Sequence, residues 1–82
     1  MHYSVRPALT PTRWAVLALV ARGASNDEIA AALGLTITAV KNHLSAIYRR
    51  LPLSSSGNRR VLAVLWYLRE GHNDYEEAGR DA

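Results

Sequence analysis

The segment "SNDEIAAALGLTITAVKNHLSAIYRR", residues 25–50, decides the fold of this 82-residue chain. It opens with a capping box, in which the Ser25 side chain accepts from the N–H of Glu28 and the Glu28 side chain reaches back to Ser25. An apolar stripe at helical spacing follows, made of Ile29, Ala30 and Leu33. Gly34 can then adopt the left-handed conformation that ends a helix. The pattern predicts a short helix of about two turns.

A second helix follows after a short turn. Thr36 is a good N-cap for a helix over residues 37–51, and Pro52 closes that helix because proline cannot continue it. Two helices joined by a turn of about three or four residues that contains glycine form a helix-turn-helix unit. We therefore expect this unit at the centre of the chain.

The flanking segments predict two more helices. Thr10 and Pro11 suit an N-cap and a first helical turn, and the helix that they begin ends at Gly23. A fourth helix is expected from residue 59 to about residue 70; its run "VLAVLWYL" could also be a strand, but the chain offers no strand to pair with it. The prediction is an all-α, four-helix domain over residues 11–70, with an N-terminal arm (1–10) and a flexible acidic tail (71–82).

Composition excludes several classes of protein. With no cysteine, the chain can form neither a disulfide nor a thiolate zinc site, and its three histidines are not at metal-ligand spacing. We expect no metal and no cofactor.

The chain has no phosphate-binding glycine loop and no evident pairing of nucleophile and base, so we expect no enzymatic activity. The longest apolar run is far shorter than the roughly 20 residues that span a bilayer, and the N-terminal residues do not show a signal-peptide pattern. We expect a cytoplasmic, nucleoid-associated protein with no membrane partner.

Charge is distributed unevenly. Residues 1–69 contain nine Lys/Arg and two acids, whereas residues 70–82 contain five acids and one arginine. A basic body suits a polyanion such as nucleic acid, although charge alone is equally compatible with an ordinary solvated surface.

The helix over residues 37–51 has two different sides. At helical spacing, one side is the apolar stripe Val40, Leu44, Ile47 and Leu51. The other side lies within an arc of roughly 100° and consists of Thr38, Lys41, Asn42, Ser45 and Arg49, with Ala46 at its edge. It carries no acid, and this absence suits a surface laid against DNA because a carboxylate there would face phosphates.

These residue types have specific partners on DNA. In a major groove, Lys41 can donate to guanine, Asn42 can pair with adenine, and Ser45 can contact either base. Phosphate contacts are expected from Thr36, Thr38 and Arg49, and from Ser25 and Asn26 at the start of the preceding helix. On the flanks, we expect His43 to be partly buried and hydrogen-bonded rather than a base reader. Tyr48 either packs on the first helix or donates its hydroxyl to a phosphate.

Three motifs resemble the LuxR-type (GerE-type) helix-turn-helix domain of bacterial transcription regulators. They are "LTP" at 9–11, "GASNDEIA" at 23–30 and "AVKNHLSAI" at 39–47. The resemblance implies a four-helix domain with helix 37–51 in the major groove and the fourth helix in a homodimer interface. It places base contacts at Lys41, Asn42 and Ser45, and phosphate contacts at positions including Thr38 and Arg49.

The chain also departs from that family's pattern. Trp14 lies in a segment that is usually acidic, Ala39 replaces a frequent threonine, and the loop over 52–58 is about four residues longer. No receiver or ligand-sensing domain precedes the motif, so we expect a stand-alone protein that is not regulated by phosphorylation or by an inducer bound to the same chain.

The fourth helix predicts an association surface. If Ala63, Val64 and Tyr67 face the core, as the family's pattern suggests, the residues that point away from it are Leu62, Leu65, Trp66 and Arg69. An exposed stripe of this kind favours a two-fold dimer. The alternative is that the loop and the N-terminal arm cover the stripe within one chain.

The function predicted from the sequence is a homodimeric, sequence-specific regulator of transcription that binds double-stranded DNA. One alternative is a protein-interaction module that docks on RNA polymerase or on another regulator. Another is a weakly specific phage or nucleoid DNA-binding adaptor. The acid-free face favours DNA, because docking on a protein does not require it.

Overall fold

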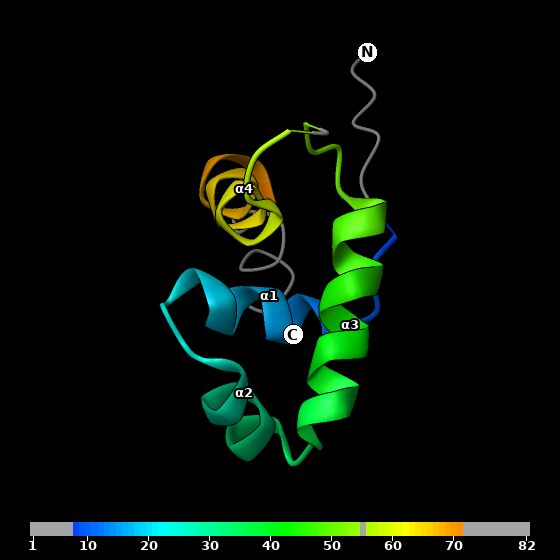
Figure 1. The fold of residues 1–82 in the computed structure, drawn as a ribbon, viewed down its shortest axis with the longest axis vertical. Helices are drawn as coiled ribbons and strands as arrows, with labels where there is room; N and C mark the ends of the chain where they lie inside the picture. The colour runs from blue at the N-terminus through cyan, green and yellow to red at the C-terminus, as the bar shows by residue number, and fades with distance from the viewer. Residues whose placement is uncertain (1–7, 55, 72–82) are drawn as a thin grey trace, which may run out of the picture.

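The computed structural model describes residues 8–54 and 56–71, and this part of the chain is entirely helical apart from its loops. The helices are α1 (Pro11–Ala21), α2 (Asn26–Leu33), α3 (Ile37–Arg50) and α4 (Arg59–Trp66), and α4 continues into the π-helical turn η1 (Tyr67–Gly71). Figure 1 shows α3 along the long axis of the molecule, with α4, α1 and α2 beside it in that order. The predicted all-α, four-helix class is confirmed. Most of the predicted arm, and the acidic tail from residue 72, lie outside the described residues.

Each α-helix begins at a polar N-cap whose side chain accepts a backbone N–H in the first turn. The caps are Thr10, Ser25, Thr36 and Asn58. The predicted capping box is present, because Ser25 Oγ accepts from the Glu28 N–H at 3.2 Å and Glu28 Oε1 accepts from the Ser25 N–H at 2.8 Å. Gly34 ends α2 with φ +68°, in the left-handed region that glycine tolerates best. Short-range signals therefore set the boundaries of the helix-turn-helix unit.

The C-terminal end of α3 differs from the prediction by one residue. The helix ends at Arg50, and Leu51 has extended backbone angles (φ −82°, ψ 146°). Pro52 explains this difference, because the residue before a proline is driven from helical to extended conformation. Leu51 nevertheless remains in the core, with 5% of its surface exposed.

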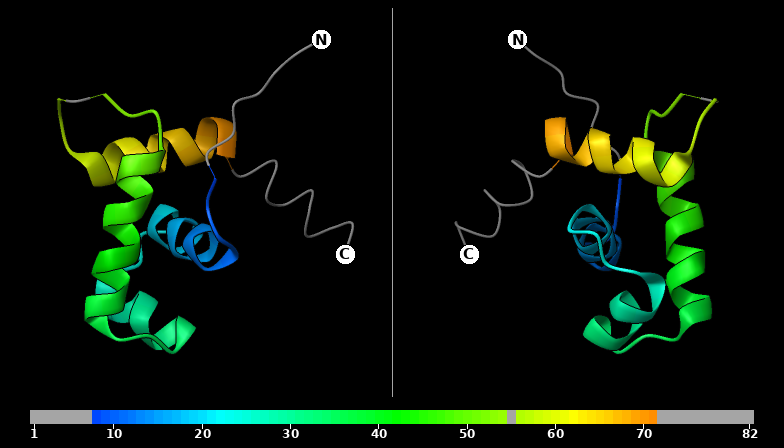
Figure 2. Two further views of the ribbon diagram at one scale, coloured as in Figure 1. Left: turned by 90° about the vertical axis from the view of Figure 1, so that its right-hand side faces the viewer. Right: turned by 60° about the vertical axis from the view of Figure 1, so that its left-hand side comes forward.

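The hydrophobic core lies where α1, α2 and α4 pack against the apolar side of α3. Its largest fully buried side chains are Val16, Leu17, Ile29, Val40 and Ile47. The predicted stripe of α3 is confirmed, because all four of its residues are buried. Ala46 is also buried, so its predicted place at the edge of the polar face is wrong. Figure 2 shows that α3 runs along one side of both α1 and α2 while α4 crosses near its C-terminal end.

The side of α4 that faces the core is not the predicted one. Ala63 and Tyr67 are buried as expected, but Val64 is only half-buried. Trp66 was expected to point away from the core, and that is wrong: 7% of its surface is exposed. The reason is Trp14 of α1, whose ring centroid lies 6.1 Å from that of Trp66 with an interplanar angle of 26°. Burying the Trp66 ring and stacking it on the half-buried Trp14 outweighs burying the smaller Val64.

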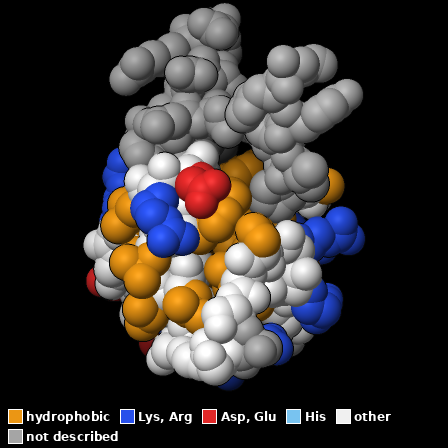
Figure 3. Space-filling model, turned by 90° about the horizontal axis from the view of Figure 1, so that it is seen from above, with side chains coloured by type: hydrophobic (Ala, Val, Ile, Leu, Met, Phe, Trp, Pro, Cys, Tyr) orange, Lys and Arg blue, Asp and Glu red, His pale blue; other side chains and the backbone are white. Residues whose placement is uncertain are grey.

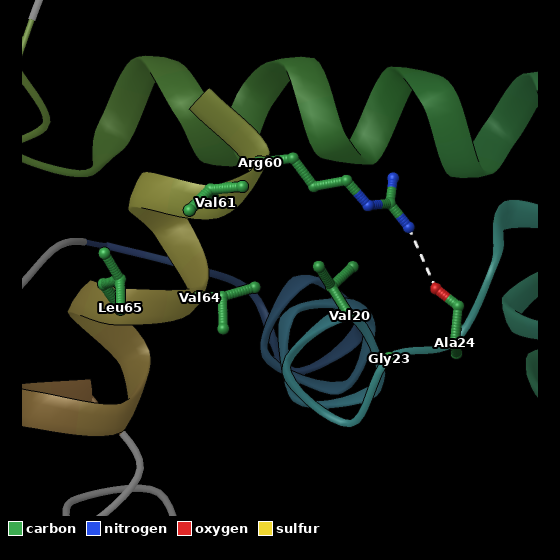
Figure 4. Close-up of a pocket in the computed structure, with 7 residues that line it drawn as sticks. All are labelled: Val20, Gly23, Ala24, Arg60, Val61, Val64 and Leu65. Carbon is green, nitrogen blue, oxygen red and sulfur yellow. Dashed lines mark hydrogen bonds between the residues drawn. The ribbon is translucent and has the colours of Figure 1, made fainter. Parts of the chain in front are cut away.

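Arg60 attaches the beginning of α4 to the helix-turn-helix unit. Its Nη1 donates to Oδ1 of Asn26, and its Nη2 donates to the carbonyl oxygen of Ala24, both at 2.9 Å. The second bond is the dashed line in Figure 4, where the Arg60 side chain extends from α4 toward the turn between α1 and α2. Besides the buried Ala63, two contacts thus hold α4, Arg60 at its start and Trp66 at its end.

Candidate nucleic-acid interface

The polar face of α3 is exposed along its whole length. Every member of the predicted set is exposed, namely Thr38, Lys41, Asn42, Ser45 and Arg49. Within residues 8–54 and 56–71, none of these side chains hydrogen-bonds to another part of the chain. The predicted exposure is confirmed. These donors and acceptors are therefore available to an external partner without breaking an internal bond, which would otherwise lower the gain on binding.

Hydroxyl groups at the starts of α2 and α3 are only partly used by capping. Ser25 Oγ and Thr36 Oγ1 each accept one backbone N–H, at 3.2 and 3.0 Å. A hydroxyl has one donor as well as its acceptor lone pairs, so each can still donate to a phosphate oxygen. Two exposed acids, Asp27 and Glu28, lie in the first turn of α2. They make that end of the helix a weaker anion site than its backbone N–H groups alone would be.

The two flanking residues of α3 are half-buried. His43 is half-buried as expected, but its ring makes no hydrogen bond within the described part of the chain, so that element of the prediction is wrong. Tyr48 lies near Arg60 of α4, a partner that neither of its predicted alternatives included. Burial raises the pKa of the Tyr48 phenol above its ordinary value, and the nearby positive charges of Arg60 and Arg59 partly offset this. At neutral pH Tyr48 is therefore uncharged.

A second exposed surface lies on α4 and has a different chemistry. Three apolar side chains recur at helical spacing and are about half exposed: Val61 (53%), Leu65 (48%) and Leu68 (53%). We call these three residues the α4 stripe; Val61 and Leu65 lie on α4, and Leu68 lies on η1, which continues it. Of the predicted interface set, Leu65 belongs to the stripe, Leu62 is half-buried and Arg69 is exposed beside it. Figure 3 shows hydrophobic side chains gathered on the face where α4 lies, interrupted by a few charged ones.

A shallow apolar pocket borders the α4 stripe. It has a volume of about 240 Å³ and lies between the C-terminal end of α1 and the start of α4. Val20 and Val64 line it from the two helices, and Val61 and Leu65 connect it to the stripe. The pocket extends the apolar surface of α4 toward α1 (Figure 4).

The described residues lack two other kinds of feature, a metal site and a membrane-spanning helix. No group of three or more His, Cys, Asp or Glu side chains there could hold a metal ion. No helix in residues 8–54 and 56–71 combines the length and the apolar content that a membrane span requires.

Sequence reasoning missed Arg60. The residue lies in an Arg-Arg pair at the start of a helix, and its partner Asn26 is 34 positions earlier in the chain. No local pattern joins two such positions, because the contact exists only once α4 has packed. The Trp14–Trp66 contact did have a signal, since these are the chain's two tryptophans and each lies on an amphipathic helix.

A helix-turn-helix unit with an exposed, cationic and acid-free second helix defines a DNA-binding domain. The chain belongs to the luxR family of bacterial regulatory proteins, because the sequence model of that family (GerE) matches residues 7–66. The family is non-enzymatic and its members are DNA-binding transcription regulators. The prediction of no enzymatic activity and the prediction of a DNA-binding transcription-regulator domain are confirmed, whereas the homodimer and the mode of DNA binding stay predictions.

Curated relatives contain the same domain within much longer chains. Over 65 residues, 42% are identical to the HTH-type transcriptional regulator MalT of Yersinia enterocolitica, covering 73% of this chain and 7% of that protein. MalT of Serratia proteamaculans and MalT of Cronobacter sakazakii are each 42% identical over 43 residues, covering 52% of this chain and 5% of each relative. The chain thus spans less than a tenth of these relatives' length. No solved structure matches it.

Proposed function

We propose that the chain binds specific sequences in double-stranded DNA as a homodimer, with α3 in the major groove, and so regulates transcription in the bacterial cytoplasm. The observation that carries this proposal is the face of α3, which is exposed, cationic and without an acid over its full length. A helix of this width fits the major groove of B-DNA, where each base pair presents a distinct pattern of donors and acceptors.

Base recognition falls to the middle of this face. Lys41 would donate to guanine O6 or N7, Asn42 would pair with adenine N6 and N7, and Ser45 would donate to or accept from either. Their side chains are exposed and make no internal hydrogen bond within the described residues, which supports this assignment. They also lie within one turn of each other along α3, so together they would read neighbouring base pairs.

Phosphate contacts would fix the register of α3 in the groove. Arg49 near its C-terminal end and Thr38 near its N-terminal end lie on the same exposed face, on either side of the base-reading residues. The hydroxyls of Thr36 and Ser25 keep a free donor despite capping, and Asn26 contributes its side-chain amide. Such contacts add affinity on any sequence and make binding sensitive to salt.

A second copy of the chain would cover the α4 stripe. Val61, Leu65 and Leu68 lie on one side of α4, and the apolar pocket next to them could receive a side chain from the partner. Pairing about a two-fold axis would also place two α3 helices on two half-sites, which increases specificity beyond that of one short helix. Leu62 and Arg69 would lie at the margin of this interface, whereas Trp66 would support it from within the core.

RNA polymerase or another regulator is the alternative occupant of the α4 stripe. The selection of bound sequences from random DNA at near-physiological salt separates these functions. The proposal predicts two related half-sites about one helical turn apart. Enrichment of an isolated half-site would contradict the dimer. Binding without sequence enrichment would indicate a weakly specific adaptor, and absence of binding would favour a protein-docking module.

A further inference from the structure

Arg60 is the one side chain in the described residues that hydrogen-bonds from α4 to the helix-turn-helix unit, and it contacts that unit at several points. It donates to the Ala24 carbonyl in the turn before α2 and to Asn26 at the first position of α2. Its charge also lies near the Tyr48 phenol of α3. Because the guanidinium is planar and its donors point in fixed directions, these contacts constrain the groups that accept from it.

The contact with Arg60 fixes which way the Asn26 amide faces. A guanidinium has donors and no acceptor, so only the carbonyl oxygen of the amide can face it. Oδ1 is indeed the atom 2.9 Å from Nη1 of Arg60. The Nδ2 group must then point away from Arg60. It makes no hydrogen bond within the described residues and is not among the buried polar atoms that lack a partner, so it is open to solvent.

The charge of Arg60 also matters at this end of α2. Asp27 and Glu28 are exposed in the same turn, and two carboxylates there would repel a phosphate. The Glu28 carboxylate is already engaged with the Ser25 N–H, which holds it close to the start of the helix. A guanidinium within hydrogen-bond distance of Asn26 partly cancels this negative field.

We propose that Arg60 is a positioning residue for DNA binding, which holds Oδ1 of Asn26 so that the Nδ2 donor faces the phosphate backbone. This inference rests on the proposed function, which places Asn26 at a phosphate. It adds that a residue of α4 sets the geometry of a DNA contact on α2. The surface proposed for dimerisation and the surface proposed for DNA are thereby joined through one side chain.

A double-mutant cycle tests this role. The full chain and the variants Arg60→Met, Asn26→Ala and Arg60→Met/Asn26→Ala are titrated against a fluorescein-labelled duplex of mixed sequence, because phosphate contacts do not depend on sequence. Each single change is expected to weaken binding roughly three- to tenfold, the value of one hydrogen bond. The affinity of the double variant for the duplex is expected to equal that of the single variant with the lower affinity. Losses that multiply would overturn the inference, because Arg60 would then act independently of Asn26.

A conservative variant separates positioning from charge and from stability. Arg60→Lys keeps the charge but has no planar fork to hold both acceptors, so an intermediate loss is expected. Full affinity in Arg60→Lys would overturn the inference, since charge alone would then suffice. All variants are compared at a temperature where circular dichroism shows them folded. If Arg60→Met does not fold, the same cycle is run with Arg60→Lys.

A control variant distinguishes a result that contradicts the whole proposed DNA interface from a result that contradicts only the role of Arg60. Arg49→Ala removes a proposed phosphate contact on α3 that does not involve Arg60. If the unmodified chain binds the duplex and Arg49→Ala weakens it, an additive cycle overturns only the role of Arg60. If the unmodified chain does not bind, or Arg49→Ala binds equally well, both proposals are contradicted.

Discussion

The exposed faces of α3 and α4 have opposite chemistry. The α3 face consists of hydroxyl, amide and cationic groups, all exposed and without internal partners in the described residues. The α4 stripe consists of Val61, Leu65 and Leu68, each about half exposed. Polar groups remain hydrated until a partner with matching donors and acceptors arrives, whereas exposed apolar side chains favour burial against any apolar surface. The difference supports the proposal that the two faces have two kinds of partner, DNA for α3 and protein for α4.

The two helices also differ in what holds them. Capping by Thr36 and a stripe of four buried residues fix α3, and both features are local in sequence. Contacts between distant residues fix α4, through Trp66 stacked on Trp14 and Arg60 bonded to Asn26. The position of α4 should therefore be the more sensitive to single substitutions.

The largest expected effect is the loss of the tryptophan contact. Trp66→Ala removes a buried aromatic ring and should lower the free energy of unfolding by about 3 to 5 kcal/mol. Thr12→Ala, at an exposed position of α1 outside both proposed surfaces, is the control and should change the free energy of unfolding by no more than about 0.5 kcal/mol. Urea denaturation of both variants measures the difference. Equal destabilisation would contradict the assignment of Trp66 to the core.

Next in size is the effect of a charge on the α4 stripe. Leu65→Asp should convert a dimer to a monomer, because a carboxylate would have to be desolvated in an apolar interface. Light scattering should then report half the mass of the unmodified chain. Ser56→Asp places the same charge in the exposed loop and should leave the mass unchanged. A dimer that survives Leu65→Asp would remove α4 from the interface.

A smaller effect is expected at the start of α3. Thr36→Ala removes the N-cap that accepts from the Ala39 N–H and should cost about 1 kcal/mol. That loss should lower the thermal midpoint by about 4 to 8 °C in a domain of this size. Thr38→Ala, two positions after the cap in the first turn of α3, is the control with the same chemical change and no cap. Equal midpoints in the two variants would show that capping does not stabilise α3.

The smallest effect concerns pH and the contact between α3 and α4. Burial raises the pKa of Tyr48 above its ordinary value of 10.0, so the folded chain holds this proton more tightly than the unfolded chain. Stability from this group is fully present below pH 10 and falls as pH rises above it. Tyr48→Phe should therefore lose less stability than the unmodified chain between neutral and strongly alkaline pH. Parallel losses in thermal melts would contradict the burial of Tyr48.

Much of the helix-turn-helix unit could be predicted because its signals are local. The Ser25 and Glu28 capping box, the left-handed Gly34 and the apolar stripe of α3 each involve residues within a few positions of one another. The exposed polar face followed from the same periodicity. The end of α3 was predicted one residue too late. Pro52 drives the preceding residue, Leu51, from helical to extended conformation, and this effect is also local in sequence.

The orientation of α4 could not be predicted because it depends on tertiary contacts. Helical spacing allows Ala63 and Tyr67 to be joined in the core by either Val64 or Trp66, and only packing against Trp14 selects Trp66. The hydrogen bonds of Arg60 and the burial of Ala46 could not be predicted for the same reason. Arg60 finds its partners 34 and 36 positions away, and Ala46 is covered when the other helices pack against α3.

The α3 face is proposed to read DNA sequence. Lys41 in its middle would contact a base, and Arg49 near its end would contact a phosphate. The most direct test selects bound sequences from random DNA with the unmodified chain, Lys41→Ala and Arg49→Ala. Lys41→Ala should lose about 1 to 3 kcal/mol of discrimination at one position of the site, because one base contact is removed. Arg49→Ala should keep the same preferred sequence while binding weakens on all sequences and the salt dependence decreases by about one unit. A uniform loss in Lys41→Ala, with no position relaxed, would contradict base recognition by this face.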